Sequence, residues 1–255
     1  EALGEHTKAL ELAEQCYEIE KRVLGEEHPD TLESLESLMV NNMKLDNHEK
    51  SIEIGEKLYD SREKILGKEH PRTIRTLHFL ILECELFDDS KKCAKYREVF
   101  YEFKCKELGK VHPDILEILN ELLYNYMDLR DAQKVVETRE RIYVIKCETL
   151  GEENHKVLFL LMQLIDDYKN IKEYKKALQC YEKLYDIEKK NGHDNDIFSL
   201  KGMAFCYKKL GNYAASLSIY KNVYENMLKI SEPTDPYVLE VMECIEELQK
   251  MISEE

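Results

Sequence analysis

Three histidines at a fixed spacing are the first residues that could do chemistry in this chain. His28, His70 and His112 each precede a proline, and they follow one another at 42-residue intervals. Zinc is often bound by histidine, but it needs about four ligands arranged as a tetrahedron at roughly 2 Å. One histidine per 42 residues places these side chains on successive layers of a repeating structure. We therefore predict no metal site and a structural role for the three histidines in loops.

The cysteines and the short sequence motifs give no sign of catalysis. Eight cysteines form no CxxC pair and no zinc-like spacing with histidine. Most of them lie where the repeat needs a small or apolar side chain, so we predict free thiols in a cytoplasmic protein. The chain has no GxSxG elbow, no phosphate-binding glycine loop and no HExxH motif. Apart from Gly55 and Gly202, the glycines fall at regular boundaries. We predict neither catalytic nor cofactor-binding residues.

Composition restricts the class of partner. The net charge is −15, with 35% charged and 43% hydrophobic residues. Nucleic acids and anionic membranes attract clustered positive charge, so an acidic chain argues against both as partners. No apolar run approaches the length of about 20 residues that a membrane span requires. The composition predicts no membrane insertion.

The elements that must position any site repeat with a fixed period. Six tyrosines, each preceded by an apolar residue, recur at intervals of 42 residues, or 39 for the last. They are Tyr17, Tyr59, Tyr101, Tyr143, Tyr185 and Tyr224. A period of this length is typical of solenoids, in which each unit packs only on its neighbours. We predict that the tyrosine rings pack between layers, with the phenol oxygens at the rim.

Each repeat is predicted to be a pair of antiparallel helices. Leu-Gly pairs end one helix, and His-Pro begins the next; in the fourth repeat we align His155 with the histidines and Lys156 with the prolines. Apolar residues then recur at spacings of three and four. The predicted single repeat domain has a leading second helix (1–26), five pairs (27–67, 68–109, 110–151, 152–192 and 193–231) and a closing helix (232–255). Its glutamates 240, 243, 246 and 247 would form a polar outer face.

The turn between the two helices resembles that of a known repeat. Gly211-Asn212-Tyr213-Ala214-Ala215-Ser216-Leu217 looks like the Gly-x-Tyr-x-x-Ala-Leu turn of the tetratricopeptide repeat. The 42-residue form with Leu-Gly-x-x-His-Pro-Asp-Thr-Leu, from Leu24 to Leu32, is similar to the repeats of kinesin light chains. The resemblance implies an all-α, right-handed superhelical solenoid of antiparallel helix pairs. It also implies a concave groove lined by the first helix of each pair.

The groove implied by the resemblance is the predicted binding site, and its carboxy-terminal part combines lysines with phenylalanines. The predicted partner-binding residues are Asn120, Tyr124, Phe159, Met162, Lys169, Phe198, Lys201, Phe205 and Lys208. Phe159 and Phe198 either form an exposed floor or fill space between helices. We predict a scaffold that binds a protein or peptide, with preference for an acidic segment carrying an aromatic or large aliphatic anchor. The alternative is the helical regulatory portion of a larger enzyme or signalling receptor.

Overall fold

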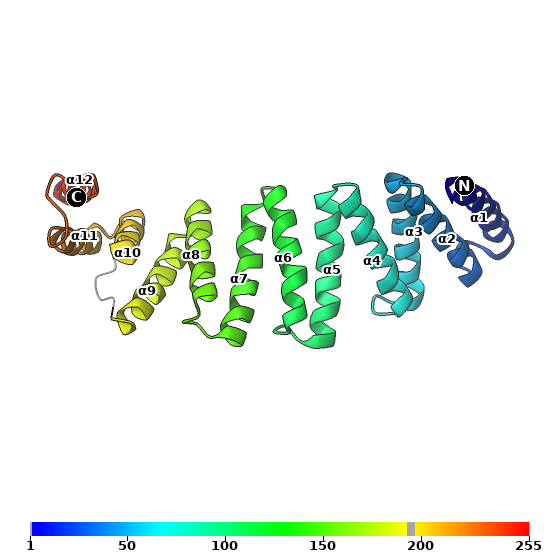
Figure 1. The fold of residues 1–255 in the computed structure, drawn as a ribbon, viewed down its shortest axis with the longest axis horizontal. Helices are drawn as coiled ribbons and strands as arrows, with labels where there is room; N and C mark the ends of the chain where they lie inside the picture. Colours follow the sequence, from blue (N-terminus) through cyan, green and yellow to red (C-terminus); the bar gives the residue numbers. More distant parts are fainter. Residues whose placement is uncertain (1, 193–196, 255) are drawn as a thin grey trace. The chain divides into compact units, whose positions relative to one another are not determined.

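The chain folds into consecutive α-helices. The computed structural model describes residues 2–192 and 197–254, with side chains from Thr7 onward. Over these residues there are twelve helices and no strand (Figure 1). The helices are α1 (Ala2–Leu24), α2 (Pro29–Lys44), α3 (His48–Leu66), α4 (Pro71–Leu86), α5 (Ser90–Leu108), α6 (Pro113–Asp128), α7 (Ala132–Leu150), α8 (His155–Asn170), α9 (Tyr174–Lys190), α10 (Ile197–Lys209), α11 (Tyr213–Met227) and α12 (Pro236–Glu254).

The helices form two compact units. Unit 1 ends at Asp131 and contains α1 to α6, and unit 2 begins at Ala132 and contains α7 to α12. Within each unit, every helix packs against the next one in the chain (Figure 1). The predicted all-α architecture of antiparallel helix pairs is confirmed in both. The division into one domain with the stated repeat boundaries stays a prediction, and its boundary at residue 193 lies outside the described residues.

Glycine ends the second helix of a pair because the backbone there takes a conformation that other residues avoid. Gly67 has φ 91° and ψ 162°, and Gly109 has φ 85° and ψ 158°. At this ψ the residue lies outside the left-handed helical region, in a region that essentially only glycine occupies. The N–H of Gly67 still donates to the carbonyl of Glu63 at 3.0 Å, which closes the helix. The recurring Leu-Gly pair therefore marks a required backbone geometry.

The periodic histidines are helix caps. Nδ1 of His28 accepts a hydrogen bond from the N–H of Asp30 at 3.3 Å, at the start of α2. His70 and His112 accept in the same way from the second helical residue of α4 and α6, each at 3.2 Å. An N-cap acceptor of this kind satisfies one of the backbone donors that a helix start leaves unpaired. The predicted structural role of these histidines is confirmed.

The predicted alignment of the fourth repeat was wrong by one residue. Asn154, rather than His155, is the N-cap of α8, and its Oδ1 accepts from the N–H of Lys156 at 3.0 Å. His155 takes the first helical position, where the other repeats have proline. Asparagine is among the preferred N-cap residues, so the cap persists although the histidine is replaced.

The apolar positions of both helices in a pair form the core. In unit 1 a cluster from α2 and α3 includes Leu35, Met39 and Leu58, and Tyr17 of α1 packs against it. In unit 2 the corresponding cluster joins α8 and α9 through Leu161, Leu164 and Leu184. None of the six periodic tyrosines is exposed, and Tyr59 is buried. The prediction of core packing is confirmed for the five tyrosines that join core clusters, namely Tyr17, Tyr59, Tyr143, Tyr185 and Tyr224. The hydroxyl of Tyr143 is buried, so the predicted place of the phenol oxygens at the rim is wrong there.

The eight cysteines are free thiols, and seven of them are buried or half-buried. The exception is Cys16, which is exposed on α1. The prediction that most of the cysteines pack at small or apolar positions of the repeat is therefore confirmed. An exposed thiol on a helix surface makes no contribution to the core that the other seven help to fill.

Candidate binding grooves

The exposed stripe opposite the core is named the groove face of each unit. In unit 1 it is formed by the first helices of the pairs, α2, α4 and α6, and in unit 2 by α8, α10 and the closing helix α12. Their apolar residues at spacings of three and four point into the core, so the side chains on the opposite stripe are open to a ligand. The groove faces of the two units carry different side chains.

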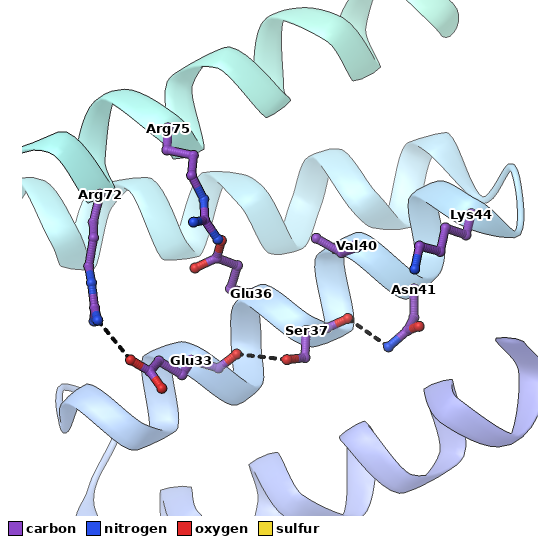
Figure 2. Close-up of a pocket in the computed structure, with 8 residues that line it drawn as sticks. All are labelled: Glu33, Glu36, Ser37, Val40, Asn41, Lys44, Arg72 and Arg75. Carbon is purple, nitrogen blue, oxygen red and sulfur yellow. Dashed lines mark hydrogen bonds and ion pairs between the residues drawn. The ribbon is translucent and has the colours of Figure 1, made fainter.

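A charged pocket lies between α2 and α4 in unit 1. Its volume is about 500 Å³, and it is lined by Glu33, Glu36, Ser37, Val40, Asn41, Lys44, Arg72 and Arg75 (Figure 2). Four of its five charged side chains are paired with one another, the exception being Lys44. Arg72 contacts Glu33 at 2.9 Å across the mouth of the pocket, and Arg75 contacts Glu36.

Glu36 is the most strongly held side chain of this charged pocket. Its second oxygen accepts a hydrogen bond of 2.5 Å from Arg62 of α3, which is only 1% exposed. Arg62 also donates to Oγ1 of Thr76 at 2.8 Å, so the network ties α3 to both α2 and α4. Burial by itself would raise the pKa of Glu36, but the two arginines lower the pKa below its ordinary value. Glu36 is therefore a structural carboxylate.

An apolar cavity lies further along the groove face of unit 1. It has a volume of about 480 Å³ and is formed by α4, α5 and α6. Leu82, Phe100 and Ile118 supply apolar surface, and the His78 ring packs edge-on against Phe100 at 4.4 Å between centroids. Burial, with a smaller contribution from Lys104, lowers the pKa of His78. A neutral imidazole is thus favoured in the wall of this cavity.

The only arginine that lines this apolar cavity is already engaged by side chains of its own unit. Arg97 of α5 is 4% exposed and bonds to Glu85 of α4, to Glu121 of α6 at 3.0 Å and to Asn125. With these partners, the guanidinium of Arg97 links α5 to both α4 and α6 and stabilises their packing. It is poorly suited to capture an incoming anion.

Two of the nine predicted binding residues belong to unit 1. Asn120 and Tyr124 are both exposed on α6, and Tyr124 is 72% exposed. The other seven residues belong to unit 2.

The groove face of unit 2 carries a row of exposed rings. Phe159 of α8 is 61% exposed, Phe198 of α10 is 48% exposed and Tyr237 of α12 is 68% exposed. The three positions lie 39 residues apart in the sequence, with Phe159 as the fifth residue of α8 and Phe198 and Tyr237 as the second residues of α10 and α12. We name these three residues the aromatic row. Phe159 and Phe198 are thus exposed on the groove face, which decides the alternative that the sequence left open.

A buried tyrosine supports the centre of the aromatic row. The Phe198 ring lies 5.8 Å from the ring of Tyr181, which comes from α9 and is 3% exposed. Gly202 of α10 makes room for this tyrosine, because a Cβ at position 202 would stand 2.2 Å from the Tyr181 ring. Glycine in the middle of a helix costs about 1 kcal/mol relative to alanine. The close approach of the Tyr181 ring explains why glycine occupies position 202 despite this cost.

The predicted lysines of unit 2 have carboxylate partners. Lys201 contacts Glu240 at 3.1 Å and Lys208 contacts Glu247 at 2.6 Å, both on α12. Lys169 contacts Asp166 within its own helix at 3.2 Å. These pairs reduce the positive potential that three lysines alone would give the groove face.

Phe205 lies deeper than the aromatic row. It is half-buried, and the ammonium groups of Lys169 and Lys209 stand 5.8 and 5.5 Å from its ring centroid. Tyr174 of α9 packs edge-on against it at 6.1 Å. Met162, the remaining predicted residue, is 40% exposed on α8. Contact between Lys169 and Phe205 joins α8 directly to α10.

Sequence reasoning missed the contribution of α12. Its four glutamates were predicted to form a polar outer face, but Glu240 and Glu247 instead pair with lysines of α10, and Tyr237 extends the aromatic row. The signal was available in the spacing. Tyr224 already follows Tyr185 by 39 residues, and the same interval from Phe198 and Lys201 leads to Tyr237 and Glu240.

Two further observations bear on the kind of site. In the part of the chain that the structure describes, no group of three or more His, Cys, Asp or Glu residues is placed to hold a metal ion. Within the same residues, none of the helices combines the length and the apolar character needed to cross a membrane.

Comparison with known proteins gives the following likenesses. Residues 1–30 match the family model described as tetratricopeptide repeat. None of the curated proteins matches the chain. A structure of nearly identical TPR-like repeats from Podosopora anserina, attributed to a kinesin light chain, is 21% identical with a TM-score of 0.44, covering 80% of this chain and 99% of that one.

Two other solved structures are similar at lower identity. BtubC (BKLC) from P. vanneervenii is 14% identical with a TM-score of 0.39, covering 90% of this chain and 94% of its own. The TPR2AB domain of yeast Sti1, in complex with an HSP90 peptide, is 11% identical with a TM-score of 0.37, covering 97% and 98%. The fold assignment rests on the helix pairs described above.

Proposed function

We propose that this chain, a tetratricopeptide repeat protein with 42-residue repeats resembling those of kinesin light chains, is a non-catalytic scaffold that binds a partner protein. The groove face of unit 2 is the proposed binding site, and a segment of the partner is the proposed ligand. Free thiols at all eight cysteines suit the reducing cytoplasm in which we expect the protein to act. Both carboxylates and both arginines that line the charged pocket are engaged in ion pairs, which favours a structural role for them over catalysis.

The aromatic row is the observation that carries this proposal. Three rings stand 48% to 68% exposed in a chain with 35% charged residues. Large exposed apolar groups with a polar rim are a feature of interaction sites, because water contact with the rings is unfavourable. Aromatic residues in the centre of an interface commonly supply most of its binding energy.

The predicted preference for an acidic partner depends on how the lysines are engaged. An acidic segment would have to compete with Glu240 and Glu247 for Lys201 and Lys208. An apolar anchor needs no such exchange, since it could bind the aromatic row directly. We therefore expect the anchor to dominate affinity, and any acidic preference to act mainly on the association rate.

A peptide-library pull-down with the full chain tests the binding site. Wild type should enrich peptides with aromatic or large aliphatic residues, and Phe198→Ala should weaken the enriched peptides by about 1–3 kcal/mol. Ile230→Ala is the matched control, because Ile230 is 76% exposed in unit 2 but lies outside the groove face. Equal binding by both variants, with intact helical content, would place the site elsewhere.

The charge preference has a separate test. Glu240→Gln/Glu247→Gln releases Lys201 and Lys208 while preserving side-chain shape. If the groove prefers acidic segments, this variant should associate with an acidic peptide several-fold faster at low salt, and the gain should shrink as salt is raised. An unchanged association rate, or a preference of wild type for basic peptides, would contradict the proposed acidic preference. The proposal of an apolar anchor would still stand.

A further inference from the structure

We propose that unit 1 has a binding site of its own, the apolar cavity formed by α4, α5 and α6, and that this site binds a partner segment with a large apolar side chain between lysines or arginines. The inference goes beyond the proposed function, which concerns the groove face of unit 2. It does not depend on the aromatic row, because the residues that line the cavity belong to unit 1.

The apolar cavity is large enough to hold one large side chain. Its volume is about 480 Å³, whereas an engineered cavity of about 150 Å³ in another protein holds a benzene ring. Ligand pockets commonly measure about 300–1,000 Å³ and have mostly apolar walls. Each helix supplies apolar surface here, with Phe79 from α4, Phe100 from α5 and Ile118 from α6. An apolar anchor in the cavity would therefore exchange water for aromatic and aliphatic contacts.

Exposed apolar side chains continue beyond the apolar cavity, which indicates a chain segment rather than a small molecule as the ligand. Leu82 lines the cavity and is 45% exposed, and Leu86, one turn further along α4, is 59% exposed. On α6, Tyr124 follows the cavity-lining Glu121 by one turn and is 72% exposed. Exposed apolar groups beside a pocket are a feature of interaction sites. A ligand that fills the cavity and also covers these side chains must extend past its mouth, as a peptide segment does.

The charge of the apolar cavity selects a basic segment. Three carboxylates and one guanidinium line it, which gives a net charge of −2 with a neutral histidine. Arg97 pairs with both Glu85 and Glu121, so one guanidinium faces two carboxylates. Glu117, the third carboxylate, has no ion-pair partner in the part of the chain that the structure describes. All three carboxylates are exposed and thus accessible to a lysine or arginine next to the anchor.

The cations beside the apolar cavity are poorly placed to hold an acidic segment. The ammonium of Lys104 lies 5.8 Å from the ring centroid of Phe100, but it pairs with Glu107 at 2.6 Å. Arg75 stands 5.9 Å from the centroid of the other phenylalanine of the wall, and it pairs with Glu36. An acidic segment would have to displace carboxylates from these cations, whereas a basic segment meets carboxylates in excess.

Three peptides of equal length test the site. The first has one phenylalanine with two lysines on each side, the second replaces the lysines with glutamates, and the third replaces the phenylalanine with alanine. Dissociation constants for the full chain come from fluorescence anisotropy at fixed salt. We expect the first peptide to bind at least about tenfold tighter than either of the others, because only it has both the anchor and the matching charge. The third peptide measures non-specific attraction to a chain with a net charge of −15.

Two pairs of matched variants place the first peptide in the apolar cavity. Leu82→Ala should weaken it by about tenfold. Ile65→Ala should have no effect, since Ile65 is 44% exposed in unit 1 but does not line this cavity. Glu117→Gln should weaken the peptide several-fold at low salt, and the loss should shrink as salt is raised. Glu49→Gln removes the charge of another exposed glutamate, on α3, and should change the dissociation constant much less.

The outcomes separate this inference from the proposed function. Loss of the first peptide in Leu82→Ala but not in Phe198→Ala supports a site in unit 1. The reverse pattern, or no response to either variant, overturns the inference. Equal binding of the first and third peptides would show attraction by net charge alone, and tighter binding of the acidic peptide to the cavity would show the wrong sign of charge; either result also overturns it.

The two sites can fail independently. If no peptide responds to Phe198→Ala, the proposed function of unit 2 is wrong, but a response to Leu82→Ala still supports the site in unit 1. Basic peptides that wild type captures through unit 1 are weakened in Leu82→Ala. The charge preference of the groove face of unit 2 is therefore measured in that background as well.

Discussion

The two units use the same repeat but differ near the start of the helices that carry the groove face, where unit 1 is charged and unit 2 is aromatic. The residues there are Glu33, Arg75 and Glu117 in unit 1, and Phe159, Phe198 and Tyr237 in unit 2. Two turns later unit 1 is apolar, with Val40, Leu82 and Tyr124, whereas unit 2 is mixed, with Asp166, Phe205 and Cys244.

The side chain beneath the groove face also varies. Gly55 and Arg97 of unit 1 and Arg139 and Tyr181 of unit 2 are equivalent in the repeat, at successive 42-residue intervals. Arg97 is surrounded by carboxylate and amide groups and Arg139 pairs with Asp167, whereas Tyr181 packs on Gly202 and Phe198. Unit 2 should therefore combine a buried ion pair at Arg139 with close packing at Tyr181.

Removal of Arg62 should give the largest loss and show how far unit 1 depends on its buried charges. Arg62→Met leaves Glu36 with Arg75 as its main partner, and we expect a loss of about 3 kcal/mol in the free energy of unfolding. Arg72→Met is the control, since the Arg72–Glu33 pair is about half-exposed on both sides. It should lose about 1 kcal/mol or less. Equal losses in urea unfolding would contradict the assigned role of burial.

Alanine at Gly202 should give the next largest effect and test the importance of shape in unit 2. The new Cβ would displace the rigid, buried ring of Tyr181, so Gly202→Ala should lower the free energy of unfolding by about 1–3 kcal/mol. It should also weaken peptide binding, because Phe198 packs on that ring.

Gly55→Ala provides the matched variant in unit 1. A Cβ there would meet Leu80 Cδ2 at 2.7 Å and Met39 Sδ at 3.0 Å, which are the ends of flexible side chains. The gain in helix propensity, about 1 kcal/mol, should offset much of the crowding. Thermal melts that show Gly55→Ala to be the more damaging change would reverse the predicted contrast.

The pH dependence of stability should have opposite signs at the buried Glu36 and the half-buried Asp167. Arginines lower the pKa of Glu36 against the effect of burial, so its contribution is present at neutral pH and is lost as the pH falls through the folded-state pKa. Burial raises the pKa of Asp167 despite Arg139, so its contribution is present at low pH and is lost as the pH rises through the folded-state pKa.

Two neutral variants measure this difference. The stability of wild type relative to Glu36→Gln should shrink between neutral pH and about pH 3, whereas that relative to Asp167→Asn should grow. The second change is mild in shape, because Asn125 already accepts from Arg97 at the equivalent position of unit 1. Parallel slopes in urea titrations would show that the two carboxylates do not differ as described.

The sequence was sufficient for the helix pairs but less so for the groove. The helix boundaries could be predicted because they depend on local backbone requirements. Leu-Gly pairs end helices, His-Pro pairs start them, and both recur at a fixed spacing. The misplaced cap at Asn154 shows the limit, because asparagine and histidine serve as alternative caps one residue apart. Exposure of Phe159 and Phe198 was left open because packing between helices depends on neighbours such as Tyr181 and Gly202.

The charge of the groove could not be predicted from lysines alone. Lys201 and Lys208 predicted positive potential, but each pairs with a glutamate from a helix assigned to the outer surface. Ion pairs depend on which helices are neighbours in space, and the 39-residue spacing that reveals the neighbour is a departure from the main period. Tyr237 was missed for the same reason.

The smallest expected effect concerns the turn between the two helices of a pair. Asp46, Asp88, Arg130 and Lys172 have φ between 54° and 62°, whereas the last turn has Gly211 with φ 79°. A left-handed conformation costs a residue with a Cβ about 1–2 kcal/mol, and glycine avoids this at an entropic cost of about 0.5–1 kcal/mol. Lys172→Gly should thus raise the free energy of unfolding by about 0.5 kcal/mol, and Gly211→Lys should lower it by a similar amount. Urea unfolding of the two variants in one background is the measurement. Opposite changes in the free energy of unfolding would show that the turn conformation sets the effect. Destabilisation by both variants would show that the lysine side chain contributes instead.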